Sequence, residues 1–189
     1  MKHKILISAF LASQCLLASQ TFAAETDPVD AAAASGPAEG TDLTTADHIA
    51  SYLANSQTIV DQIKSTSFDS QVIVSSIDSM LNEVSPVLQA YSAVFPLCKE
   101  QLDKVIELLP QIETWTAQEI RTNIEAGKAL PATNGNCYPA RDVVAHPAIV
   151  RALVKTGGAS ATRLLREINE AIEHMTDISG LFPAEEPAS

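Results

Sequence analysis

Apolar side chains recur every three or four residues through most of the chain between residues 44 and 182. This spacing places them along one side of an α-helix, which has about 3.6 residues per turn. The clearest case is the last such segment, where the apolar positions are Leu164, Leu165, Ile168, Ile172, Met175 and Ile178. The β-branched run at 71–77 keeps the same helical register. The sequence therefore predicts an all-α protein, a small bundle of five to six helices.

Two proline-containing stretches bear on where the helices begin and end. Ser85 followed by Pro86 is typical of a helix N-terminus, so we expect the second helix to break or kink there. His146 precedes Pro147, and a residue before proline disfavours the α conformation. We therefore expect a loop over 130–146, with His146 at the entry of a short helix and in a structural role.

The N-terminal residues 1–23 have the layout of a secretory signal peptide. Lys2 and Lys4 precede an apolar run over 5–17, and a stretch of small residues follows it. This run is shorter than the roughly 20 residues that a transmembrane helix needs. We therefore expect an exported protein, periplasmic or extracellular, with no stable membrane insertion.

Composition divides the remainder of the chain into three parts. Residues 24–43 are rich in Ala, Gly, Pro and acidic side chains and have almost no large apolar ones, which predicts a disordered leader. The tail 183–189 has a similar composition. Between them, residues 44–182 are enough for one ordinary domain.

Two cysteines remain once the signal peptide, with Cys15, is removed. In an oxidising compartment a pair such as Cys98 and Cys137 most often forms a disulfide, which we expect here. Closing a loop of about 40 residues would stabilise the fold by about 4 kcal/mol in the chain-entropy model. The alternative is a nucleophile pair of Cys137 with His146, which needs a free thiolate that export disfavours.

Chain length shows where such a disulfide requires a reversal. A straight helix over 98–128 would be about 45 Å long, whereas the nine residues 129–137 span at most about 30 Å. The second cysteine could then not return to the first. We therefore expect a reversal at 110–116, where Thr116 and Glu119 form a capping-box pattern that opens another helix.

The charge of the chain excludes some partners. It carries 12 basic and 23 acidic residues, a net charge of −11. Such a surface repels nucleic acid and anionic lipid headgroups, so we expect neither as a partner.

Basic residues nevertheless gather near the C-terminus. The five candidates for binding an anion or an acidic partner are Arg141, Arg151, Lys155, Arg163 and Arg166. Two of them lie near the positive end of the last helix dipole, where cations are mildly unfavourable. A face of local salt bridges is the favoured interpretation, and a binding corner is the alternative.

The last helix also carries a set of potential metal ligands. Glu170, Glu173, His174 and Asp177 have helical spacing, which can present a carboxylate and an imidazole together. They fall opposite the apolar stripe centred on Ile168, so a solvated polar face is the favoured interpretation. We therefore expect no metal and no cofactor, with Glu170, His174 and Asp177 as weak candidates.

No motif in the chain indicates a particular reaction. The H-E-x-x-H, G-x-S-x-G and calcium-loop patterns are absent from the sequence. The favoured hypothesis is a non-catalytic binding module that takes a protein partner or a small ligand, with the basic corner as a candidate place for an anionic ligand or an acidic partner. The alternative is a small-ligand carrier, a metal- or cofactor-binding protein, or an enzyme with a site near Arg141, Asp142 and His146.

Overall fold

The computed structural model describes residues 43–133 and 135–182 of the chain. Every regular element in these ranges is a helix, which confirms the all-α prediction. None of these helices is long and apolar enough to cross a membrane. The expected signal peptide 1–23, nearly all of the expected leader 24–43 and the tail 183–189 lie outside the described residues.

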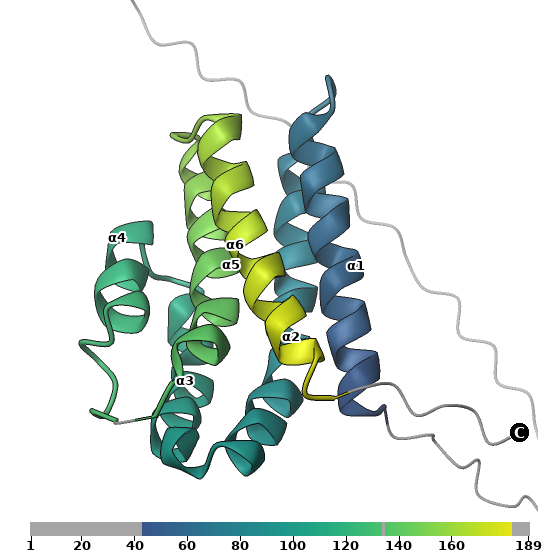
Figure 1. The fold of residues 1–189 in the computed structure, drawn as a ribbon. Helices are drawn as coiled ribbons and strands as arrows, with labels where there is room; N and C mark the ends of the chain where they lie inside the picture. The colour runs from purple at the N-terminus through teal and green to yellow at the C-terminus, as the bar shows by residue number, and fades with distance from the viewer. Residues whose placement is uncertain (1–42, 134, 183–189) are drawn as a thin grey trace, which may run out of the picture. The chain divides into compact units, whose positions relative to one another are not determined.

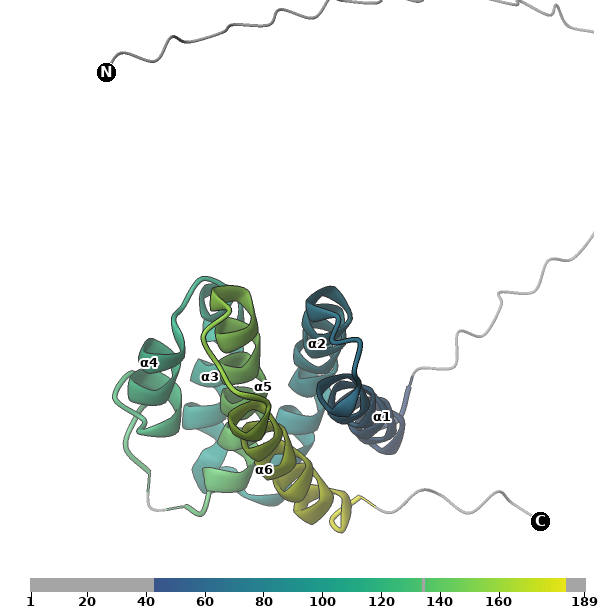
Figure 2. The same ribbon diagram turned by 90° about the horizontal axis from the view of Figure 1, so that it is seen from above.

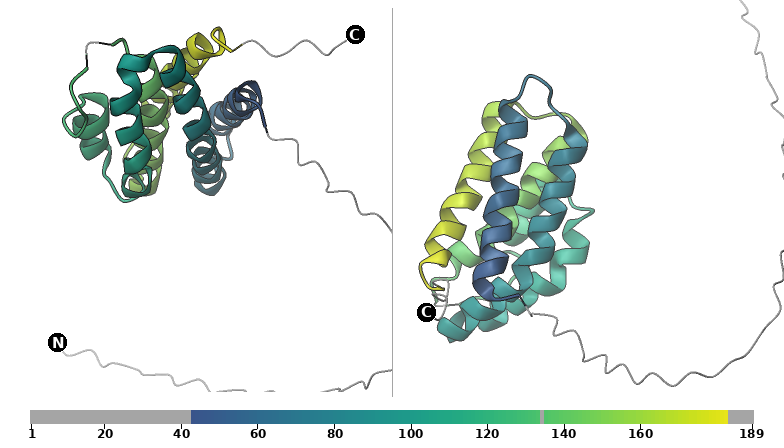
Figure 3. Two further views of the ribbon diagram at one scale, coloured as in Figure 1. Left: turned by 90° about the horizontal axis from the view of Figure 1, so that it is seen from below. Right: turned by 90° about the vertical axis from the view of Figure 1, so that its right-hand side faces the viewer.

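Four long helices form the centre of the bundle. They are α1 (Thr45–Lys64), α2 (Ser70–Val94), α5 (Tyr138–Thr156) and α6 (Ala161–Ser179). Helices α1 and α5 each pack against both α2 and α6 (Figures 1 and 2), and the right-hand view of Figure 3 shows α1 between α6 and α2. Side chains from all four are fully buried between them, among them Tyr52, Ile77, Ile149 and Ile168.

Two shorter helical segments flank this centre. A 3-10 turn, η1 (Pro96–Cys98), leads into α3 (Lys99–Ile112), which packs against α2 and α5. After the reversal comes α4 (Ala117–Ile120), continued by a π-helical turn, η2 (Arg121–Glu125). Figures 1 and 2 show α4 beside α5, on the side away from α1. The predicted reversal and the Thr116 capping box are both confirmed.

The predicted disulfide joins the beginning of α3 to the beginning of α5. Cys98 and Cys137 are bonded, with an S–S distance of 2.01 Å and a Cα–Cα distance of 5.4 Å. Both cysteines are buried. A Cβ atom at Gly135 would lie 3.1 Å from both sulfur atoms, so a larger residue at this position would require its neighbours to shift.

The predicted break at Pro86 and the predicted helix entry at His146 are wrong. Helix α2 continues through Pro86, and α5 already begins at Tyr138, so His146 and Pro147 lie inside it. A proline inside a helix leaves the carbonyl four residues earlier without its usual donor, which here is Val143 O. The Tyr52 hydroxyl of α1 donates to that oxygen at 2.7 Å. The hydrogen bond that Pro147 cannot make is therefore replaced from another helix.

Candidate metal centre

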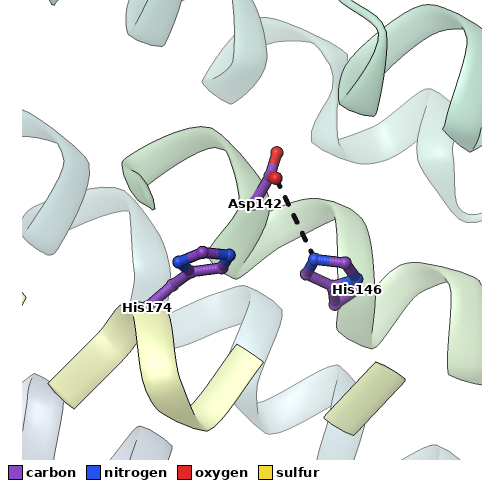
Figure 4. Close-up of side chains that lie close together, drawn as sticks. All are labelled: Asp142, His146 and His174. Atoms are coloured by element: carbon purple, nitrogen blue, oxygen red, sulfur yellow. Dashed lines mark ion pairs between the residues drawn. The ribbon is translucent and has the colours of Figure 1, made fainter. Parts of the chain in front are cut away.

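A group of ionisable side chains lies in the interface between α5 and α6. Asp142 and His146 are one helical turn apart on α5, and His174 faces them from α6 (Figure 4). Asp142 is completely buried and His146 is 2% exposed. The sequence-based expectation of a solvated face is thus wrong for His174, which is half-buried.

One atom of each of these three residues has no hydrogen-bond partner. Asp142 Oδ2, His146 Nε2 and His174 Nδ1 are all shielded from solvent and unpaired. A ligand atom from each of the three residues lies within 4.8 Å of the other two, and the distance from His146 Nε2 to Asp142 Oδ2 is 3.9 Å. A buried polar atom without a partner typically costs about 1–3 kcal/mol. A single cation between the three residues would offset these costs together.

Hydrogen bonds occupy the other polar atoms of Asp142 and His146, and they leave Asp142 Oδ2 and His146 Nε2 free. His146 Nδ1 lies 3.1 Å from Glu167 Oε2 and 3.3 Å from Glu170 Oε2. When Nδ1 carries the proton and donates it to Glu167, the lone pair of neutral imidazole is on Nε2, facing Asp142. Asp142 Oδ1 accepts from Arg141 Nε at 3.0 Å, so Oδ2 remains available.

Glu167 supports this arrangement from behind His146. Its side chain is 2% exposed, and its Oε1 accepts from Arg121 and from Arg166, the latter at 3.1 Å. Burial would raise the pKa of this carboxyl, but the hydrogen bonds from His146 and Arg166 and the charge of Arg121 lower it to about 2. Because its oxygens are already occupied, Glu167 orients the imidazole, as carboxylates do behind metal-bound histidines.

The pKa values of Asp142 and His146 are both shifted toward the protonated form. Burial raises the pKa of Asp142 above its ordinary value, and the neighbouring Arg141 only partly compensates. Burial lowers the pKa of His146, but the hydrogen bond to Glu167 and the charges of Asp142 and Glu170 outweigh burial and raise it. A proton or another cation is therefore favoured at this place.

The outer side of the cluster is lined by aromatic and charged groups. The Tyr138 ring meets His174 edge-on at 4.9 Å between centroids and is 50% exposed. The Arg141 guanidinium lies 5.5 Å from the centre of the same ring. The Glu170 side chain is 42% exposed. The side chains of Tyr138, Arg141 and Glu170 therefore lie between the site and solvent.

The five predicted basic residues do not form one corner. Arg141 lies near the beginning of α5, and the 14 residues to Lys155 correspond to about 21 Å of helix. Arg151 is buried, and its Nε lies 2.8 Å from Asp78 Oδ1. Only Arg163 and Arg166 share one place, at the beginning of α6. Their binding role stays a prediction.

Sequence reasoning missed Glu167 and treated Asp177 as equivalent to His174. Glu167 lies between Leu164 and Ile168, within the buried side of α6, and a charged residue in that position was the signal. Asp177 is exposed and belongs to neither group of possible metal ligands found among the described residues. The spacing of Asp142 and His146, four residues apart in one helix, was a second signal.

Comparison of the chain with protein-family models, with curated proteins and with solved structures found no match. The α5–α6 cluster is therefore the feature of this protein from which a function can be inferred.

The metal-free protein is expected to lose stability as the pH falls from about 4.5 toward 2. The folded-state pKa of Glu167 is about 2 and its ordinary value is 4.5, so the unfolded chain binds a proton first. The contribution of Glu167 is complete above about pH 4.5 and is lost below it. Urea unfolding between about pH 6 and 3 measures this loss, and Glu167→Gln should flatten it. Equal slopes for both proteins would contradict the assignment.

Proposed function

We propose that this chain is an exported, non-catalytic binding protein that holds one divalent transition-metal ion at Asp142, His146 and His174. Two observations carry this proposal: ligand atoms of the three residues, from two helices, lie within 4.8 Å of one another, and each residue has a buried polar atom without a hydrogen-bond partner. Each of the three would gain a partner from the same ion.

The donor set selects the class of metal. Two imidazoles and one carboxylate suit Zn²⁺, Fe²⁺, Ni²⁺ or Cu²⁺, whereas Ca²⁺ and Mg²⁺ prefer oxygen ligands throughout. The two cysteines of the described domain are bonded to each other, so no thiolate is available there as a ligand. Imidazole and carboxylate donors remain usable in an oxidising compartment, which fits the export that the N-terminal sequence predicts.

Three protein ligands leave a coordination position for water or a small ligand. Tyr138, Arg141 and Glu170 lie on the solvent side of the site, where that position would open. The two helices that carry the ligands are packed against each other, so the site is largely formed before the ion arrives. Such a site can bind an ion without a large rearrangement of the two helices.

Metal titration of the chain without residues 1–23 tests the proposal. Metal-stripped protein is expected to bind one Co²⁺ per chain, with the visible absorption of a low-symmetry nitrogen–oxygen site, and Zn²⁺ should displace it. His146→Ala and Asp142→Ala should each weaken binding by more than about 100-fold, since even supporting residues typically account for about 10- to 100-fold. Calcium and magnesium should not compete.

A second histidine–carboxylate pair provides the matched control. His48 of α1 pairs with Glu83 of α2, outside both groups of possible ligands. His48→Ala should therefore leave the Co²⁺ stoichiometry and affinity unchanged. Equal affinities of wild type, His146→Ala and Asp142→Ala would overturn the assignment, and equal losses in His48→Ala and His146→Ala would show adventitious histidine binding.

A further inference from the structure

We propose that a second, separate site on this protein binds a small tetrahedral oxyanion of the phosphate or sulfate type. It is an open cavity of about 510 Å³ between η2 and the N-terminal end of α6. The residues that line it are Gln118, Arg121, Ser160, Thr162, Arg163 and Arg166. Two of these arginines belong to the predicted basic group, and Arg121 comes from a different part of the chain.

The lining of this cavity is positive in a strongly negative protein. Three guanidinium groups contribute to it and no carboxylate does, although the chain has a net charge of −11. Arg121 and Arg166 each donate a hydrogen bond to Glu167 Oε1, at the inner side of the cavity. Each guanidinium has five N–H donors, more than its contact with Glu167 uses.

Carboxylates near the cavity pair with Arg121 and Arg166 but not, among the described residues, with Arg163. Glu125 lies 3.6 Å from Arg121, and Glu170 lies 3.9 Å from Arg166. Within the part of the chain that the structure describes, Arg163 has no carboxylate within 4.0 Å. Arg163 is exposed, so its guanidinium is the free cation of this cavity.

Stability does not account for Arg163 at this place. Arg163 is the third residue of α6, a helix of 19 residues, and positive charge near a helix N-terminus is unfavourable by a few tenths of a kcal/mol or more. The first N–H groups of a helix have no acceptor within it. Ser160 Oγ accepts only one of them, from Arg163 N at 3.3 Å. An anion bound here would be attracted both by the Arg163 guanidinium and by the first N–H groups of α6.

The chemistry of the lining selects the kind of anion. The planar fork of arginine donors matches the paired oxygens of phosphate and sulfate, and the Thr162 hydroxyl and Gln118 amide add neutral donors. The net negative charge of the chain disfavours a polyanion or an anionic membrane, which would meet repulsion beyond the cavity. A small soluble ion avoids that repulsion.

Calorimetric titration of metal-free protein with inorganic phosphate, at low ionic strength in chloride buffer, tests this site. Saturable binding of one phosphate per chain is expected, and sulfate should compete for it. Arg163→Ala should weaken binding at least about tenfold, because charge-assisted hydrogen bonds are the stronger class. Arg163→Lys should recover part of the affinity, since it keeps the charge without the fork.

Lys155 provides the matched control, because it is an exposed cation of α5 that does not line the cavity. Lys155→Ala should bind phosphate like wild type, and Arg163→Ala should keep the wild-type melting midpoint. His146→Ala should also bind phosphate normally, so that this site is judged independently of the metal. Absence of saturable binding, or equal losses in Lys155→Ala and Arg163→Ala, would overturn the proposal.

Discussion

Replacing Glu167 by alanine is expected to destabilise the metal-free protein by about 3–5 kcal/mol. Glu167 is 2% exposed and is the shared acceptor for Arg121, Arg166 and His146. Removing it leaves a nearly buried imidazole without its hydrogen-bond partner and the Arg121 guanidinium without its shortest contact. Losing one member of a buried charged group costs far more than the intact group contributes, because the remaining charges lose their compensation.

Urea unfolding at neutral pH measures this loss, and α6 itself offers the control. Glu170 also contacts His146, at 3.3 Å, but its side chain is 42% exposed. Glu170→Ala should therefore cost less than about 1 kcal/mol. Glu167→Gln, which keeps the shape but not the charge, should fall between the two. Equal effects of the two alanine substitutions would contradict the supporting role of Glu167.

The Glu167 substitution also has an expected effect on the metal. Metal-bound histidines lose about 10- to 100-fold in affinity when the carboxylate behind them is removed. Glu167→Ala should therefore weaken Co²⁺ binding within that range while Asp142 and both histidines remain in place. Affinity unchanged from wild type would separate Glu167 from the metal site and leave it a role in stability alone.

Removing the disulfide by replacing both Cys98 and Cys137 with alanine is expected to cost about 4 kcal/mol. The two residues are 39 positions apart, and their bond restricts the unfolded chain over that whole loop. The loop includes α3, α4 and η2, so the reduced chain must close it without covalent help. Denaturant midpoints of the oxidised wild type and the double variant measure the difference.

A second measurement separates the loop effect from packing at the two positions. Both cysteines are buried, so the alanine side chains also remove a few packed atoms. Unfolding the wild type in the presence of a reductant keeps those atoms and breaks only the bond. Reduced wild type and the double variant should therefore have similar stabilities, both well below that of the oxidised protein. A reduced wild type as stable as the oxidised protein would contradict the prediction.

Much of the fold follows from local rules that the sequence states directly. The apolar repeat along 164–178 predicts a buried helix, and Thr116 with Glu119 predicts a helix start, because both depend on residues within one or two turns. The disulfide follows from predicted export and the two remaining cysteines. The reversal at 110–116 then follows from chain length, since a straight helix could not bring the cysteines together.

The candidate site depended on information that local rules do not contain. The sequence assigned His174 to a solvated face because the apolar stripe marks only the apolar part of the buried surface. Helix α6 packs against both α1 and α5, so its covered surface is wider than that stripe and includes Glu167. Whether a polar side chain at the border of a stripe is covered depends on the neighbouring helices.

Pro147 is a second position where local rules gave a wrong prediction, in this case for the backbone. Local preference favours a helix boundary before it, and that preference placed His146 in a loop. A hydroxyl from Tyr52, 91 residues earlier in the chain, instead satisfies Val143 O and lets α5 continue. The sequence determined the helical segments, because these depend on neighbours in the chain, and it determined the covalent link, because only two cysteines remain to pair. The tertiary structure alone decided which polar atoms are buried together, because burial and hydrogen bonding depend on neighbours in space.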